Sequence, residues 1–265
     1  MKIAILYFSG TGNTYYVAKE FEDQFQQLGF QCDLFRLEDG NLTSETISTY
    51  DLIGFGAPVY GSSFPHIVKT KIKSLQGHQS CFTFVTQMMF SGDGAAYLGR
   101  LIQKQGFQSR YQIHINMPNN ITDISWLTRK HPPYEVIAKR VHRKVAFLIH
   151  RIQTNRPYRL GSNPFSLMLG LLQRFPYEHF DQQSMANLIK IDAKSCIQCM
   201  RCIELCPVHN LDFEENQVMT RGHCEVCYRC LNHCPTKAIR IVGRKAPKHP
   251  YHGPTANFQI DILKK

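Results

Sequence analysis

Short apolar runs recur along the first half of the chain and predict the strands of a sheet. Four runs, at residues 3–8, 32–37, 52–57 and 81–85, are almost continuously apolar, which is typical of strands buried on both faces. A fifth run, at residues 111–117, alternates apolar with polar side chains. This alternation predicts an edge strand with one face in water.

Helical periodicity fills the segments between these runs. Val17, Ala18, Phe21, Phe25 and Leu28 share one face of a helix after the first run. Further helices are expected at about residues 65–75, 93–105 and 134–153, the last with basic side chains along its outer side. Strands that alternate with helices predict an α/β fold, a doubly wound five-stranded parallel sheet in the order 2-1-3-4-5, over residues 1–155.

Residues 156–186 interrupt this pattern and are expected to form a connector. Asn163 and Pro164 break regular structure, and residues 165–175 then form a short apolar helix. We expect this helix to pack between two domains; the alternative is an interfacial patch that touches a membrane or a partner. No apolar run approaches the roughly 20 residues that cross a bilayer, and the first run is too short for a signal peptide. The expected location is the cytoplasm.

Ten cysteines change the picture for the second half of the chain. Cys32 and Cys81 lie in predicted strands and are expected to be buried structural thiols. The other eight form two copies of the pattern C-x₂-C-x₂-C-x₃-C-P, offset by 28 residues. The pattern is the signature of bacterial ferredoxins with two [4Fe–4S] clusters. It places a small α+β ferredoxin domain at residues 187–243, followed by a basic tail at residues 244–265.

The spacing of each repeat explains how it can hold a cluster. Three closely spaced cysteines reach three irons of a cubane, and the fourth ligand must come from the other repeat. Paired zinc sites are the alternative, but zinc sites use other spacings and often histidine. The residue after the second cysteine, often glycine in such ferredoxins, is Met200 in the first repeat and Tyr228 in the second. The expected ligands are Cys196, Cys199, Cys202 and Cys234 for cluster one, and Cys224, Cys227, Cys230 and Cys206 for cluster two.

A glycine- and hydroxyl-rich loop directly follows the first predicted strand and precedes the first helix. Backbone N–H groups, hydroxyls and a helix N-terminus together bind a phosphate. The loop has neither the lysine of a P-loop nor the spacing of a dinucleotide site, so it favours a mononucleotide. Its residues are Ser9, Gly10, Thr11, Gly12, Asn13 and Thr14.

This loop resembles the FMN-phosphate loop of flavodoxins, and the whole chain resembles the EFR-type family of fused flavodoxin/ferredoxin proteins. The resemblance covers residues 1–155 and 187–243 and implies a flavodoxin-like fold, FMN, two [4Fe–4S] clusters and electron transfer. Two further loops stand where flavodoxins contact the flavin ring, at the carboxyl ends of the third and fourth strands. The first comprises Pro58, Val59, Tyr60, Gly61 and Ser62, and the second Thr86, Gln87, Met88, Met89, Phe90, Gly92 and Asp93.

Charge and the remaining motifs narrow the function. The 265 residues carry a formal net charge of +11, which favours an acidic redox protein as partner, with nucleic acid or a membrane surface as alternatives. No nicotinamide-binding or acid–base motif is recognised. The leading hypothesis is an electron carrier that passes electrons between the clusters and FMN. The alternatives are an FMN-dependent reductase of a small substrate, and a redox sensor or binding module. The sequence does not indicate an oligomeric state.

Overall fold

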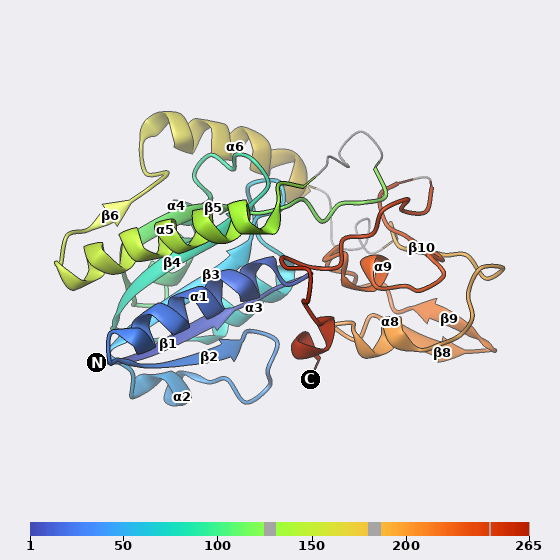
Figure 1. The fold of residues 1–265 in the computed structure, drawn as a ribbon, viewed down its shortest axis with the longest axis horizontal. Helices are drawn as coiled ribbons and strands as arrows, with labels where there is room; N and C mark the ends of the chain where they lie inside the picture. The colour runs from blue at the N-terminus through green and yellow to red at the C-terminus, as the bar shows by residue number, and fades with distance from the viewer. Residues whose placement is uncertain (125–130, 180–186, 244, 265) are drawn as a thin grey trace. The chain divides into compact units, whose positions relative to one another are not determined.

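In the computed structural model, the described residues are 1–124, 131–179, 187–243 and 245–264 (Figure 1). They form two structural units. Unit 1 comprises Met1–Ser9, Asn13–Met117 and Glu135–Glu178, and unit 2 comprises Gly10–Gly12, Pro118–Tyr134 and His179–Lys265. Residues 180–186, which end the predicted connector, and both Arg244 and Lys265 of the predicted tail lie outside the described residues.

Unit 1 is built on a parallel sheet in the order β2-β1-β3-β4-β5-β6. The five predicted strands appear in the predicted order, which confirms the flavodoxin-like fold class. The sheet nevertheless has six strands, because a two-residue strand from the predicted connector pairs in parallel with β5. The strands are β1 Lys2–Tyr7, β2 Gln31–Arg36, β3 Leu52–Pro58, β4 Ser80–Gln87, β5 Gln108–Asn116 and β6 Tyr158–Arg159.

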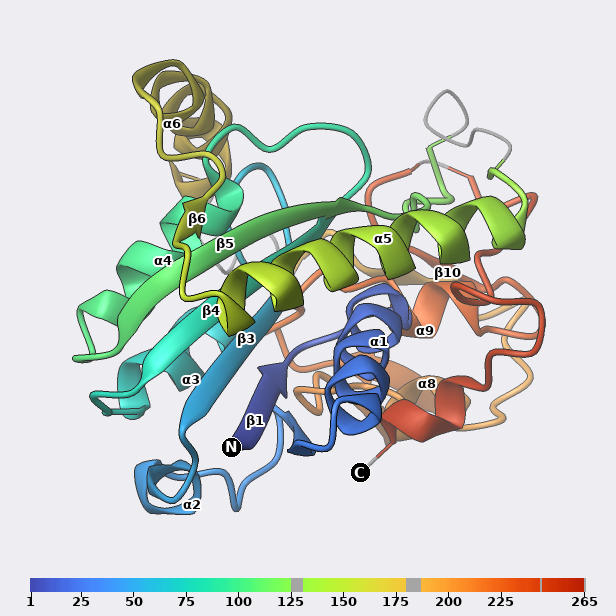
Figure 2. The same cartoon turned by 60° about the vertical axis from the view of Figure 1, so that its left-hand side comes forward.

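Helices cover both faces of this sheet. Helices α1 and α5 lie on one face, and α3 and α4 lie on the other (Figure 2). The predicted inner face of α1 is buried as expected at Val17, Ala18, Phe21 and Phe25, whereas Leu28 lies beyond the end of the helix and is exposed. The helices are α1 Asn13–Gln27, α2 Ser44–Ser48, α3 His66–Ser74, α4 Gly94–Gln103, α5 Tyr134–Gln153 and α6 Pro164–His179.

Strand β5 differs from its prediction. Its polar residues Gln112 and His114 are buried, so the expected wet face is wrong. Local partners satisfy both side chains. Gln112 donates to the hydroxyl of Ser109 at 3.0 Å, and the His114 Nε2 accepts from the backbone N–H of Ala95 at 2.8 Å. Burial lowers the pKa of His114 to about 4, which keeps this nitrogen an acceptor.

Helix α6 extends the predicted 165–175 segment and presents the opposite face to the protein. Its buried residues are Ser166, Gly170 and Arg174, spaced four apart along one side. The large apolar side chains on the other side are exposed, so the expectation that they would be packed is wrong. Among the described residues, no helix has both the length and the apolar character needed to cross a bilayer.

Unit 2 is a small α+β assembly, as predicted for the cysteine-rich domain. Two antiparallel pairs, β7 Lys190–Ile191 with β10 Ile239–Arg240 and β8 Leu211–Glu214 with β9 Gln217–Thr220, accompany helices α8 Arg201–Glu204 and α9 Arg229–Asn232. The predicted tail packs within this unit, with Tyr251, Ile260 and Leu263 buried and a short 3₁₀ helix, η1, at Ile260–Leu263. The apolar core consists of Ile189, Leu211, Val218, Tyr228, Cys230, Leu231, Ile239 and Ile241.

Candidate functional site

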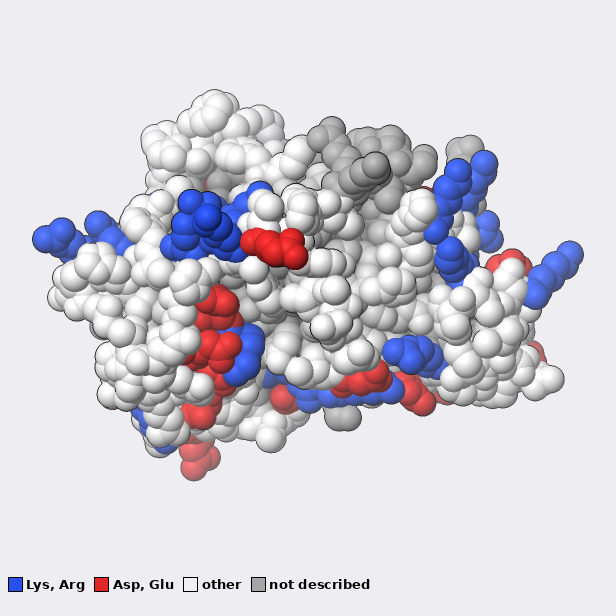
Figure 3. Space-filling model, in the orientation of Figure 1, with Lys and Arg blue, Asp and Glu red and all other residues white. Residues whose placement is uncertain are grey.

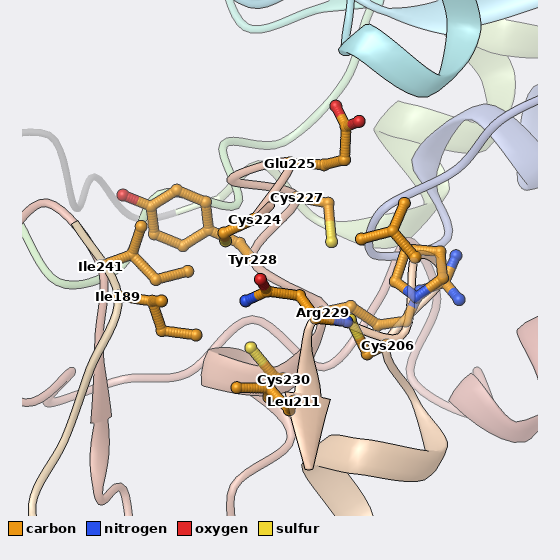
Figure 4. A pocket seen from close by; sticks show the side chains of 13 residues that line it. Ile189, Cys206, Leu211, Cys224, Glu225, Cys227, Tyr228, Arg229, Cys230 and Ile241 are labelled. Atoms are coloured by element: carbon orange, nitrogen blue, oxygen red, sulfur yellow. The ribbon is translucent and has the colours of Figure 1, made fainter. Parts of the chain in front are cut away.

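Two hollows in unit 2 are each lined by four cysteines. One, of about 320 Å³, is lined by the three cysteines of the second repeat's triplet together with Cys206 of the first repeat (Figure 4). The other, of about 350 Å³, is lined by the first repeat's triplet together with Cys234 of the second. The structure thus brings together both predicted ligand sets, each with its fourth cysteine from the other repeat.

The two repeats have left-handed backbone conformations at the same positions, and these wrap each cysteine triplet around its hollow. Gln198 and Val226 have φ angles of 55° and 52°, and Met200 and Tyr228 have φ angles of 59° and 63°. These are left-handed conformations, which glycine adopts without strain and which cost other residues free energy. This explains why glycine is common after the second cysteine of such repeats. In each repeat a one-turn helix, α8 or α9, starts directly after the left-handed residue.

Backbone N–H groups point at the sulfurs in a repeated pattern. The N–H of Asn210 donates to the Cys206 sulfur at 3.2 Å, and the N–H of Ala238 donates to the Cys234 sulfur at 3.3 Å. Each donor lies four residues after its cysteine, so the two repeats make the same contact. Hydrogen bonds to sulfur favour the thiolate and are one way in which a protein sets a cluster's potential.

Burial makes these thiols poor acids without metal. It raises the pKa of Cys202 and Cys224 to about 11 and that of Cys227 to about 12, with the nearby Arg229 cation acting in the opposite direction on Cys227. Iron would have to displace these protons, so cluster assembly and folding of this unit are coupled. Within the described ranges, no three His, Cys, Asp or Glu side chains lie close enough together to hold a single metal ion. The cysteines surround hollows instead.

One carboxylate fastens the second repeat to the rest of unit 2. The Asp123 Oδ1 accepts from the Tyr228 hydroxyl at 3.0 Å, and its Oδ2 accepts from the backbone N–H groups of Ile241, Val242 and Gly243 at 2.8 to 2.9 Å. Sequence analysis missed Asp123, because its partners lie more than 100 residues away and no local pattern marks it. Its role is to hold Tyr228, which lines the Cys206-containing hollow.

A second missed residue, Arg229, is buried between two cysteines of the second triplet. Its guanidinium donates to the backbone carbonyls of Leu205 and Leu263 at 3.2 Å and of Gly10 at 3.1 Å. Its counterpart in the first repeat, Arg201, is partly exposed and lies 3.6 Å from the carboxylate of Asp261. The arginine before the third cysteine of each repeat is therefore buried in the second repeat and partly exposed to solvent in the first.

The predicted phosphate loop has the features of an anion site. The hydroxyl-bearing residues Ser9, Thr11 and Thr14 are buried, and the Thr14 hydroxyl hydrogen bonds to that of Thr86 at 2.8 Å. Helix α1 begins at Asn13 with no acidic side chain in its first turn, so no carboxylate of that turn offsets the positive end of the helix, which favours an anion. Gly12 has a φ angle of 96° and the Phe258 ring lies where a Cβ would be, so only glycine fits there. These residues fit a nucleotide phosphate.

The first predicted ring loop forms a tight turn. Tyr60 and Ser63 exchange backbone hydrogen bonds at 2.9 Å, with Gly61 and Ser62 both at positive φ between them, as in a type I′ turn. Val59 adds a backbone bond to the Thr86 carbonyl at 3.0 Å, and Pro58 ends β3. The two predicted ring loops are therefore neighbours at the carboxyl ends of β3 and β4, where ligands bind in this fold.

The second predicted ring loop divides into two parts. Met88, Met89 and Phe90 are exposed, and the Met89 carbonyl accepts from the side chains of Gln87 at 3.0 Å and Asn116 at 2.6 Å. Gly92 and Asp93, by contrast, pack against α6. A Cβ on Gly92 would lie 2.5 Å from the backbone nitrogen of Gly170.

Helix α6 contacts both ring loops; sequence analysis predicted the helix but not these contacts. Arg174 pairs with the fully buried Asp93 at 2.7 Å, and Arg100 pairs with the same carboxylate. Gln173 accepts from the Ser62 hydroxyl, and Glu178 accepts from the Ser63 hydroxyl at 2.9 Å. The available signal was the presence of these polar residues in an otherwise apolar helix.

Tyr97, which follows the second ring loop, belongs to the same packing. Its ring stacks on Phe64 with the centroids 5.7 Å apart, and the Arg174 guanidinium lies 3.6 Å from the Tyr97 centroid. Its hydroxyl hydrogen bonds to Glu178 at 3.1 Å. Tyr97 is therefore a packing residue of unit 1, whereas Phe90 is exposed.

Comparison with known proteins agrees with this division of the chain. Residues 4–110 match a family model described as a flavodoxin domain, and residues 188–235 match one described as a 4Fe-4S dicluster domain. No curated protein matches the chain.

Several solved structures are similar to part of this chain. Oxidised flavodoxin 1 from Bacillus cereus is 16% identical, with 57% of this chain and 98% of that chain covered and a TM-score of 0.41. Flavodoxin 2 from the same organism is 15% identical, with 57% and 99% covered and a TM-score of 0.42. Two-electron reduced Megasphaera elsdenii flavodoxin is 22% identical, with 43% and 82% covered and a TM-score of 0.36.

The two family matches agree with the loops and cysteines described above. A flavodoxin domain implies FMN, a 4Fe-4S dicluster domain implies iron–sulfur clusters, and both support an electron-transfer role. The chain therefore carries a flavodoxin domain in its N-terminal part and a 4Fe-4S dicluster domain in its C-terminal part, which is consistent with a fused flavodoxin/ferredoxin.

Proposed function

We propose that this protein passes electrons between two [4Fe–4S] clusters and one FMN carried by the same chain. The observation that carries the proposal is the pair of separate four-cysteine hollows in a chain that also holds a buried phosphate loop at the start of α1. FMN supplies one- or two-electron chemistry, whereas each cluster supplies one-electron chemistry. The fusion would let one-electron donors fill a two-electron store.

The proposed ligand sets follow the two hollows. Cluster one takes the first triplet and Cys234, and cluster two takes the second triplet and Cys206. Support comes from the lining of each hollow and from the matching N–H bonds to Cys206 and Cys234. The crossed arrangement would staple the two repeats together, so loss of iron should unfold both.

The proposed flavin contacts divide between the phosphate and the ring. Backbone N–H groups and hydroxyls of residues 9–14 would hold the phosphate, with the positive end of α1 offsetting its charge. Tyr60 in the first ring loop, and Met88, Met89 and Phe90 in the second, offer aromatic and apolar surface to the ring. Asp93 has a structural part in this account, because Arg174 and Arg100 neutralise it.

The external redox partner is proposed to be an acidic protein that meets the first cysteine repeat. Cys199 is exposed there, which gives a partner short access to cluster one. Lys190, Lys194 and Arg240 lie nearby along the chain or the β7–β10 pair, and the whole chain carries a formal charge of +11. Complementary charge speeds encounter and makes its rate fall with added salt.

Cofactor content and flavin reduction test this function. Anaerobically purified protein should hold about eight iron, about eight sulfide and about one FMN per chain. After mixing with a low-potential one-electron donor, the flavin absorbance should bleach. A Thr11→Val, Thr14→Val double variant, which lacks two buried hydroxyls of the phosphate loop, should keep its iron and lose FMN. Clusters that reduce while bound flavin stays oxidised would contradict the proposal.

A further inference from the structure

Helix α6 carries its apolar side chains on the outside. Phe165, Leu171 and Leu172 are 65%, 62% and 64% exposed, and Met168 and Phe175 are exposed on the same side. Each of these five residues lies three or four positions from another of them, so they form one stripe along the helix. The side facing the protein is small or polar instead. An exposed apolar stripe of this size on a soluble protein marks an interaction surface.

The helix is held firmly in this orientation. Gly170 sits so close to Asp93 that a Cβ there would lie 1.8 Å from the carboxylate, and Arg174 pairs with that carboxylate at 2.7 Å. At the start of the helix, the Asn163 side chain accepts from the backbone N–H of Ser166 at 2.9 Å. Turning the apolar stripe inward would take Arg174 away from the buried Asp93, leave that carboxylate with Arg100 alone, and bury no polar partner in place of Arg174. The outward stripe is therefore a fixed feature of unit 1.

A basic hollow is lined by residues of α5 and by the segment that directly precedes α6. It measures about 720 Å³, much of it open to solvent, and is lined by Arg140, Arg143 and Lys144 of α5 and by Tyr158 and Leu160. Leu160 stands only four residues before the start of α6. Lys144 is held in place by donating to the His114 carbonyl at 2.6 Å, and Arg140 donates to the Asn116 carbonyl at 3.4 Å.

The side chains that line this hollow are basic or uncharged, and the surrounding segments are mostly basic. Residues 94–117 and 135–178 of unit 1 hold two acidic residues, Glu135 and Glu178, and 11 lysines and arginines, of which Arg100 and Arg174 pair with Asp93. Figure 3 shows basic side chains gathered over α5 beside an uncharged surface over α6. An occupant of this face must therefore be apolar where α6 lies and anionic where α5 lies.

We propose that the exposed face of α6 and the basic hollow beside it attach the protein to an anionic lipid bilayer. The helix is about 24 Å long at 1.5 Å per residue, and its polar side is bound to the protein, so it would lie flat with its stripe among the acyl chains. The basic side chains would meet lipid phosphates. A bilayer fits better than a protein groove, because the stripe is a ridge of aliphatic and aromatic groups and carries no exposed charge.

Vesicle flotation with the cofactor-loaded, full-length protein tests the proposal. Binding is expected to phosphatidylcholine vesicles containing phosphatidylglycerol and not to phosphatidylcholine alone, and it should weaken with added salt. Leu171→Glu and Leu172→Glu should each weaken binding about tenfold or more, because each removes a leucine that would be buried among the acyl chains of the bilayer. Arg140→Gln and Arg143→Gln should each weaken it about fivefold and reduce its salt dependence.

A matched control separates this effect from general surface change. Leu28 is also an exposed leucine of unit 1 but lies at the end of α1, so Leu28→Glu should bind vesicles as the unchanged protein does. Iron and FMN content, measured on each variant, shows whether the variant is folded. The readout is vesicle binding, which does not depend on electron transfer. The proposal is overturned if anionic vesicles do not bind, if the α6 variants bind normally, or if Leu28→Glu weakens binding equally.

Discussion

The two cysteine repeats have the same spacing and the same backbone turns but different surroundings. In the first repeat Cys199 is exposed, and so is its neighbour Ile197. In the second repeat Cys227 and Cys230 are buried. The motif therefore dictates how the chain wraps a cluster, while the rest of unit 2 dictates how much solvent reaches it. Since exposure and hydrogen bonding tune cluster potentials, the two clusters should differ in potential and in access to partners.

The difference has a structural cause in segments distant along the chain. Asp123 binds Tyr228 and three backbone N–H groups around the second repeat, and Asn232 of α9 accepts from the Thr122 hydroxyl at 2.6 Å. The first repeat has Arg201 beside Asp261, a pair with both side chains more than 40% exposed. Exposed pairs contribute little to stability, whereas a buried carboxylate with four donors contributes much.

The largest expected effect comes from removing a cysteine that one repeat supplies to the cluster of the other repeat. Cys234→Ala should destroy cluster one, although Cys234 belongs to the second repeat, and should lower iron from about eight to about four per chain. Its remaining EPR signal should match that of Cys199→Ala and differ from that of Cys206→Ala. Cys81→Ala, a buried cysteine of β4, should keep all its iron. If Cys234→Ala instead resembles Cys227→Ala, each repeat holds its own fourth ligand.

A smaller effect is expected from the carboxylate that fastens the second repeat. Asp123→Ala should cost about 3 kcal/mol of stability in unit 2, because it leaves buried donors without their acceptor. Iron release to a chelator should then become faster, with cluster two lost first. The control is Asp192→Ala, since Asp192 caps exposed backbone near the first repeat and should change the release rate little. Equal acceleration by both variants would contradict the account.

The smallest effect distinguishes the two left-handed residues. Met200→Gly should stabilise the protein by about 1 kcal/mol, because glycine adopts this conformation without strain. Tyr228→Gly relieves the same strain but removes a buried ring and its bond to Asp123, so it should destabilise the protein by about 2 kcal/mol or more. Chemical denaturation of the two cofactor-loaded variants compares them. Changes of the same sign would show that surroundings matter less than backbone conformation.

Much of the fold could be predicted from local patterns. The apolar runs and the helices between them give the strand order, because parallel strands joined by helices allow few topologies. The cysteine groups follow from the 28-residue offset of two equal repeats. Burial of Cys32 and Cys81 is also confirmed. Each of these features depends on residues close together in sequence or on an internal repeat.

The remaining features depend on contacts between distant segments. Gln112 and His114 form a polar pattern that predicts a wet face, yet they are buried because Ser109 and Ala95 meet them. The apolar composition of α6 predicts a packed helix but cannot show that Arg174 must face Asp93. Both errors have the same physical origin, since a buried polar group with a partner outweighs the preference of apolar side chains for the interior.

The most direct test of cluster-to-flavin transfer within one chain is the rate of flavin reduction at several protein concentrations. The protein is mixed anaerobically with a one-electron donor in less than stoichiometric amount, and cluster and flavin absorbance are followed together. If transfer occurs within one chain, the clusters should reduce first, and the flavin should then reduce at a rate independent of protein concentration. A flavin rate proportional to protein concentration would contradict it, because electrons would then be passing between molecules.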